Sequence, residues 1–360
     1  MKVKNMYMKR VMMMALLTLL VQTVMAQSEA VQYWHHSWEN VSGQDRVTNY
    51  SSLCTNYKVL DASTSLSDSR EFGVGDNPEW DNGGYKWVVV KGEVTISRLI
   101  VKGEGHLILT DGSRLVCSDG VELQGDGNSL NIYSQSSGDQ EGRLEAKLSQ
   151  SKYKYNAAIG CIDDYKVNGS PGGMGTLVIH GGVITATANN RAAGIGGGED
   201  RGIQPNGSVT IYGGTVTATG GFKAAGIGGG NDAGQGGPVT IYGGTVTATG
   251  GDGGAGIGGG FRYSNGGSGG QVKIYGGNVT VRGGHRASAI GAGEASLSAQ
   301  ELSSFTMEGG TVHASSDYES AICGTIAIRG GELIIRGEDE GYGLRGIITY
   351  CAVEYYEKTA

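Results

Sequence analysis

The stretch that decides the fold is VTIYGGTVTATGGFKAAGIGGG (residues 209–230), which recurs almost unchanged as VTIYGGTVTATGGDGGAGIGGG (residues 239–260). Self-similarity with a period of about thirty residues is typical of a solenoid, in which each repeat packs on its neighbours. Within each copy, apolar residues alternate with threonine or tyrosine, and glycine pairs separate the runs. Alternation with a period of two predicts β-strands, and the glycine pairs predict turns between them.

Three apolar columns emerge when the repeats are aligned. The first and third columns are 16 residues apart in five of the seven units, whereas the segment leading to the next unit varies in length. A constant core followed by a variable loop predicts three short strands per coil, with one coil per repeat. The three columns are Ile132, Ile179, Ile211, Ile241, Ile274, Met307 and Ile328; Leu144, Ile184, Val216, Val246, Val279, Val312 and Leu333; and Ile159, Ile195, Ile227, Ile257, Ile290, Ile322 and Leu344.

These columns predict an all-β fold, a right-handed parallel β-helix of roughly nine coils that are spaced at about 4.8 Å. Segments without the repeat flank it, and we expect them to cap the exposed ends of the solenoid. The predicted division is 1–26 signal peptide, 27–86 N-terminal capping segment, 87–344 parallel β-helix and 345–360 C-terminal cap.

Residues 1–26 have the pattern of a secretory signal peptide, with Lys2, Lys4, Lys9 and Arg10 before a short apolar run and Ala26 at the expected cleavage site. The apolar run is too short to span a membrane, so we expect an exported protein: periplasmic, cell-surface or secreted. With 28 basic and 35 acidic residues the chain is acidic, which argues against a nucleic-acid partner. Five cysteines without a metal-binding spacing are interpreted as small buried residues, and their disulfide pairing stays open.

The order VVVKGEVTISRLIVKGEGHLILTDGSRLVC (88–117), GNSLNIYSQS (127–136) and then repeated GGTVTATGG and AGIGGG resembles a group of repeat proteins exported by anaerobic and gut-associated bacteria. The resemblance covers about residues 87–335 and implies a β-helical surface or secreted protein. Some related β-helix proteins of anaerobes bind carbohydrate and calcium, so the resemblance also implies an extracellular glycan as partner. It supplies no catalytic residue.

A row of outward aromatic residues is the first candidate binding surface. Tyr212, Tyr242 and Tyr275 take equivalent positions in successive repeats, and His180 precedes them. Aromatic faces at regular spacing suit stacking on sugar rings, whereas tyrosine is also a common residue of half-exposed strands. Threonines form a second regular surface. A flat threonine array can match the surface of ice or of a crystalline polysaccharide, whereas strand propensity and cross-strand pairing of β-branched residues explain it without a ligand, and we favour this second interpretation. The threonines are Thr185, Thr187, Thr215, Thr217, Thr219, Thr245, Thr247, Thr249 and Thr280.

Acidic loop residues are candidate ligands for Ca²⁺, which takes six to eight oxygen ligands. Glu199 and Asp200 follow one IGGG segment, and Asn231 and Asp232 follow the next. The chain lacks the nonapeptide of calcium-binding β-rolls, so solvated loop carboxylates are the competing interpretation.

The function expected from these features is a non-catalytic binding or adhesion scaffold that recognises extracellular carbohydrate. One alternative is a polysaccharide lyase or glycoside hydrolase, which needs clustered carboxylates. The candidate residues for such an enzyme are Asp163, Asp164 and His285, but more than three coils separate the two aspartates from the histidine. A structural protein of the cell envelope is the other alternative.

Overall fold

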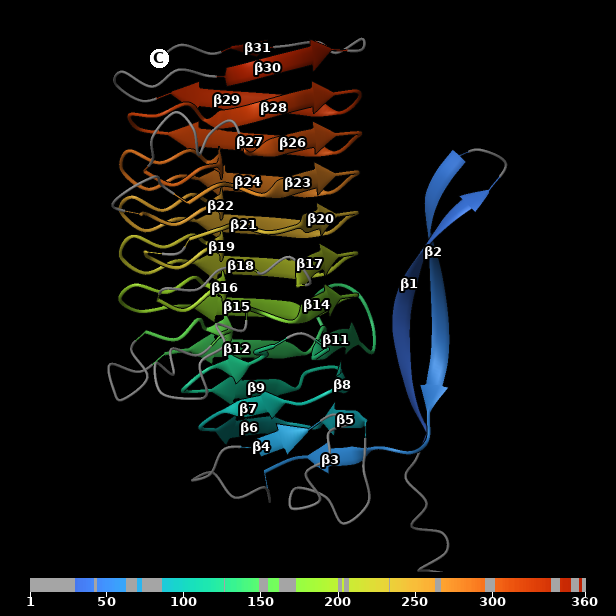
Figure 1. The fold of residues 1–360 in the computed structure, drawn as a ribbon. Coiled ribbons are helices and arrows are strands. Elements are labelled where there is room, and N and C mark those ends of the chain that lie inside the picture. Colours follow the sequence, from blue (N-terminus) through green and yellow to red (C-terminus); the bar gives the residue numbers. More distant parts are fainter. Residues whose placement is uncertain are drawn as a thin grey trace, which may run out of the picture.

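The protein forms a long stack of parallel β-coils with an antiparallel hairpin at its side (Figure 1). The computed structural model describes residues 30–41, 44–62, 70–72, 86–125, 127–148, 155–161, 173–199, 203, 207–232, 234–262, 267–294, 302–337, 344–350 and 356–357. The hairpin consists of β1 (Val31–Val41) and β2 (Gln44–Cys54). No helix in the described part of the chain is long and apolar enough to cross a membrane.

The first stack of strands follows the first apolar column. Its members pair in parallel from one coil to the next, without a break between β3 and β30. They are β3 (Lys58–Leu60), β5 (Trp87–Val90), β8 (Glu104–Leu109), β11 (Ser129–Ser134), β14 (Thr176–Ile179), β17 (Ser208–Ile211), β20 (Val239–Ile241), β23 (Gln271–Ile274), β26 (Ser304–Met307), the end of β28 (Ile322–Ile328) and the end of β30 (Leu344–Tyr350).

The second stack is a separate 10-stranded parallel sheet that follows the second apolar column. It contains β6 (Glu93–Ile96), β9 (Arg114–Cys117), β12 (Arg143–Lys147), β15 (Val183–Thr187), β18 (Thr215–Thr219), β21 (Thr245–Thr249), β24 (Asn278–Arg282), β27 (Thr311–Ser316), β29 (Glu332–Gly337) and β31 (Tyr356–Glu357). The third stack contains β4 (Arg70–Phe72), β7 (Leu99–Val101), β10 (Val121–Glu122), β13 (Ile159–Gly160), β16 (Ile195–Gly196), β19 (Ile227–Gly228), β22 (Ile257–Gly258), β25 (Ile290–Gly291) and the starts of β28 and β30.

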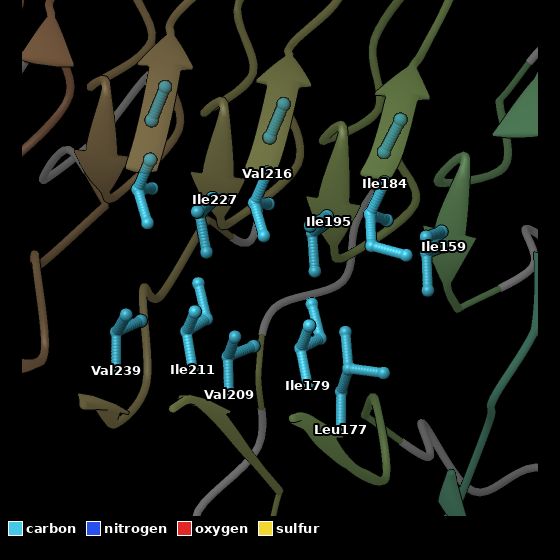
Figure 2. Close-up of a cluster of buried hydrophobic side chains, with 14 of the residues drawn as sticks. Ile159, Leu177, Ile179, Ile184, Ile195, Val209, Ile211, Val216, Ile227 and Val239 are labelled. Carbon is cyan, nitrogen blue, oxygen red and sulfur yellow. The ribbon is translucent and has the colours of Figure 1, made fainter. Parts of the chain in front are cut away.

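The three predicted columns are confirmed in every register. Ile179 lies opposite Ile211, Ile184 opposite Val216, and Ile195 opposite Ile227, and the same pairing continues along each stack. Except for the half-buried Leu344, the side chains of the three columns are buried, and they point into one interior from three sides (Figure 2). Burying an isoleucine or leucine contributes about 1.5–3 kcal/mol, so the repeated columns account for the stability of the stack.

A column of glycines explains the IGGG part of the repeat. Gly196, Gly228 and Gly258 follow the isoleucines of the third stack, and each has a positive φ (137°, 141° and 142°) that favours glycine. A Cβ atom on Gly228 would overlap the carbonyl oxygen of Gly258 in the next coil. The close approach of the coils at this corner therefore requires glycine.

The parallel ladder is longer than the predicted span of residues 87–344. β3 and β4 already pair in parallel with β5 and β7, and β30 continues to pair with β28 as far as Tyr350. The hairpin stands along the side of the solenoid rather than across its end (Figure 1). The variable segment between coils almost vanishes at Cys323, where β28 runs straight through as the last strand of one coil and the first of the next. The predicted signal peptide, 1–26, lies outside the described residues.

Candidate functional site

One outward column of the first stack changes character along the solenoid; we call it the outer column. It is apolar in the early coils, aromatic in the middle, and ends in an ion pair between Glu308 and Arg329. Its members follow or lie within the paired strands in one continuous register: Val59, Val89, Ile108, Tyr133, His180, Tyr212, Tyr242, Tyr275, Glu308 and Arg329.

The aromatic part of the outer column is a continuous stack of rings. Tyr133 and His180 lie 4.7 Å apart between ring centroids, Tyr212 and Tyr242 lie 4.8 Å apart, and Tyr242 and Tyr275 lie 4.9 Å apart, with interplanar angles of 3–16°. His180 and Tyr212 are likewise parallel, at 5.2 Å. These separations reproduce the spacing of neighbouring strands, about 4.8 Å, so each coil places its ring on the ring of the next.

The hairpin covers the early part of the outer column. Tyr33 packs on Trp87 and Tyr133, each at 4.9 Å, and Val31 joins a second hydrophobic cluster with Val89 and Ile108. The run Val88–Val90 of β5 and the run Leu107–Leu109 of β8 are therefore buried on both faces, which their uninterrupted apolar sequences require.

Histidines hold the hairpin to the ring stack. The backbone N–H of His36 donates to Nδ1 of His180 at 3.0 Å, and the His36 ring lies parallel to the His180 and Tyr212 rings, at 5.9 Å from each. His35 lies 6.5 Å from His180. Burial, and then the neighbouring His36, His35 and His106, lower the pKa of His180 to about 3. His180 is therefore neutral at physiological pH, with its proton on Nε2 because Nδ1 accepts a hydrogen bond.

The predicted tyrosine row is present, and the stacking changes what it offers a ligand. Tyr212, Tyr242 and Tyr275 have faces that lie against neighbouring rings, so their edges and hydroxyls are what point outward. His180 is 8% exposed and lies under the hairpin. The row also begins one coil earlier than predicted, at Tyr133. Tyr133 follows Ile132 as Tyr212 follows Ile211, so the aligned sequence could have identified it. The geometry assigns these rings to coil stacking and hairpin docking, and their role as a glycan site stays a prediction.

The nine threonines form a regular field on the outside of the second stack; we call it the threonine face. The pairing of β15, β18, β21 and β24 places Thr185, Thr217, Thr247 and Thr280 in one row, with Thr215 and Thr245 on one side and Thr187, Thr219 and Thr249 on the other. None of their hydroxyls has a hydrogen-bond partner among the described residues. The face therefore presents unused donors and acceptors at a spacing of about 4.8 Å along the solenoid.

Exposed aromatic residues line one corner of the threonine face. Phe222 and Tyr318 take equivalent positions three residues after the ends of their rows, and they are 48% and 44% exposed. His285 occupies the same position between them and meets the Tyr318 ring edge-to-face at 4.6 Å. Sequence inspection missed this corner because its residues differ in type from coil to coil. A hollow of about 230 Å³ lies at the end of the face, lined by Thr280, His313, Ala314, Ser315, Ile334 and Arg336.

The described members of the predicted calcium ligands have separate partners. Glu199 forms an ion pair with Arg191 at 2.7 Å, and the side-chain amide of Asn231 donates to Asp232 at 2.9 Å. Asp200 lies outside the described residues. Among those described, no three His, Cys, Asp or Glu side chains group as metal ligands. The described side chains thus supply fewer than the six to eight oxygens that Ca²⁺ takes, and a calcium site at these loops stays a prediction.

The residues considered for catalysis and redox chemistry have other surroundings. Asp163 and Asp164 lie outside the described residues, and His285 faces Asp252 at 3.7 Å on an exposed turn. Cys54, Cys117, Cys161 and Cys323 are buried, as the sequence interpretation expected of small residues of the interior, and Cys351 lies outside the described residues. Burial raises the pKa of Cys117 to about 12, which makes this thiol a poor nucleophile.

Comparison with protein families agrees with this geometry. A family model described as a beta helix repeat matches residues 177–199, 209–231, 239–261 and 272–294. Each match covers the strands of one complete coil, from the first apolar column through the glycine corner. The chain is therefore a parallel β-helix repeat protein. No significant match was found among curated proteins or among solved structures.

Proposed function

We propose that this protein is an exported, non-catalytic scaffold that binds extracellular carbohydrate, and that the threonine face is its contact surface. The observation that carries the proposal is the field of nine outward hydroxyls without partners among the described residues. Sugars are recognised by hydroxyl hydrogen bonds together with aromatic contacts, and Phe222, His285 and Tyr318 supply the latter along one edge. A stack of identical coils suits a polymer, since both repeat along one axis.

Two matched double variants test whether the threonine face, rather than another surface of the solenoid, binds the polysaccharide. Thr217→Val with Thr247→Val removes two hydroxyls from the centre of the face and keeps the β-branched shape. Thr210→Val with Thr240→Val makes the same change on the same two coils but on the first stack. We expect the first pair to weaken binding on a polysaccharide array by roughly tenfold or more, at about 1 kcal/mol for each hydrogen bond removed, and the second pair to leave it unchanged.

Equal binding by the two double variants would remove the threonine face from the proposal. The competing enzyme function is tested by incubating the protein with pectin and related polymers while reducing and unsaturated ends are measured. A hydrolase or lyase would release such ends, and their appearance would overturn the non-catalytic role. The structural alternative predicts a protein that is anchored in the envelope and binds none of the polymers on the array.

A further inference from the structure

One row of the threonine face differs in charge from the chain as a whole; we call it the cationic row. It runs through the last outward position of successive strands of the second stack: Lys147, Thr187, Thr219, Thr249, Arg282, Ser315 and Arg336. The row holds three cations and four hydroxyls and no carboxylate, although the chain has 35 acidic and 28 basic residues. The two other rows of the same sheet do contain carboxylates, at Glu145 and Glu332.

Arg336 differs in its surroundings from Arg282 and Arg329. Arg282 pairs with Asp317 at 3.1 Å, and Arg329 pairs with Glu308. Arg336 forms no ion pair with a described residue, and its side chain lines the hollow at the end of the face. An exposed guanidinium is a planar fork of donors that matches a carboxylate or a sulfate.

The hollow surrounds that guanidinium with groups suited to a sugar. Thr280 and Ser315 supply hydroxyls, His313 supplies a ring nitrogen, and Ile334 supplies an apolar surface. Arg282 stands two coils before Arg336 in the same row, so their backbones are about 10 Å apart at a coil spacing of about 4.8 Å. An extended anionic chain that lies along the row can therefore reach both arginines.

We propose that the ligand of the threonine face is an acidic polysaccharide, with an anionic group of the chain bound by Arg336 in the hollow and the rest of the polymer following the cationic row. This inference rests on the proposed function and names the class of its ligand. The anionic group is a carboxylate or a sulfate, which share the chemistry that a guanidinium recognises.

The test measures binding of the full chain to polygalacturonate, dextran sulfate and neutral dextran by calorimetry at low and moderate salt. We expect an acidic polymer to bind at least tenfold more tightly than neutral dextran, and salt to weaken that binding. The polymer that binds more tightly identifies the anionic group. Arg336→Gln should weaken binding about tenfold, the magnitude of one charged hydrogen bond, and Arg336→Lys should recover part of it. Arg143→Gln is the matched control, since it removes the same charge from an exposed position on another row of the sheet.

The outcomes separate this inference from the function beneath it. If neutral and acidic polymers bind equally and Arg336→Gln has no effect, while the Thr217 and Thr247 double variant weakens both, the acidic ligand is wrong and the threonine face stands. If Arg143→Gln weakens binding as much as Arg336→Gln, the attraction is general and the hollow is not the site. If none of the polymers binds, both proposals fail.

Discussion

Acidification should release the hairpin β1–β2 from the ring stack before the β-helix unfolds. His180 is 8% exposed, and its Nδ1 accepts the backbone N–H of His36 at 3.0 Å. A protonated imidazole can no longer accept that bond, and its charge would lie beside His36, His35 and His106. Burial also lowers the pKa of each of these three histidines, so their protonation opposes docking in the same direction.

The magnitude follows from the pKa of His180, which is about 3 in the folded protein against an ordinary value of 6.5. Between pH 6.5 and pH 3, His180 binds a proton when the hairpin is undocked but not when it is docked. The contribution of His180 to docking is therefore complete above pH 6.5 and is lost as the pH falls toward 3. From about pH 7 to about pH 4 the loss from this one group is about 3 kcal/mol. The hairpin can relieve this cost by undocking alone, because it joins the solenoid at one end (Figure 1).

Amide hydrogen exchange resolves the two events, since protection of residues 31–54 reports the hairpin and protection of β19 reports the coils. We expect hairpin protection to fall by roughly a hundredfold between the two pH values while β19 stays protected, after correction for intrinsic exchange rates. His180→Tyr places in the stack the residue that the next three coils carry, and it should remove most of the pH dependence. His313→Gln, which removes a histidine far from the hairpin, should leave the pH dependence unchanged. Unchanged protection in the wild-type protein, or an equal loss in His180→Tyr, would refute the reasoning.

Two further outcomes follow from the stacking of the coils. Replacing both Tyr212 and Tyr242 by Ala should lower the free energy of unfolding by about 0.5–1.5 kcal/mol for each stacked ring pair that is removed. The same change should leave polysaccharide binding unchanged. Weaker binding with normal stability would instead place the glycan site on the tyrosine row. Gly228→Ala should prevent formation of a stable solenoid, because the added methyl group overlaps the carbonyl of Gly258. Gly92→Ala should fold, because its methyl group meets no atom within 4 Å. Chemical denaturation compares the two variants, and normal stability of Gly228→Ala would contradict the close approach of the coils at this corner.

The binding surface was less predictable than the coils. The tyrosine row was visible in the sequence, and a spacing of about 4.8 Å between identical residues already implies that their rings stack on one another. The uninterrupted apolar strands at Val89 and Ile108 likewise imply a cover on their outer face. What covers them could not be inferred, because the hairpin residues share no repeat with the coils. The cationic row lies three residues after each member of the second apolar column, so the predicted register already contained it, although its charges are separated by long stretches of chain.

The sequence by itself determined the coil: alternation of apolar and polar residues set which side chains are inside, and the repeat of about thirty residues set which residues lie on top of one another. A shift by one residue would expose the whole apolar set, so this register has no close competitor. Only the tertiary structure decided where the hairpin packs and that it covers the first aromatic rings of the outer column. Only the tertiary structure also showed that Arg336, Thr280 and His313 line one hollow. The hairpin contacts join segments with unrelated sequences, and the hollow depends on the burial and distance of particular side chains, which no local pattern encodes.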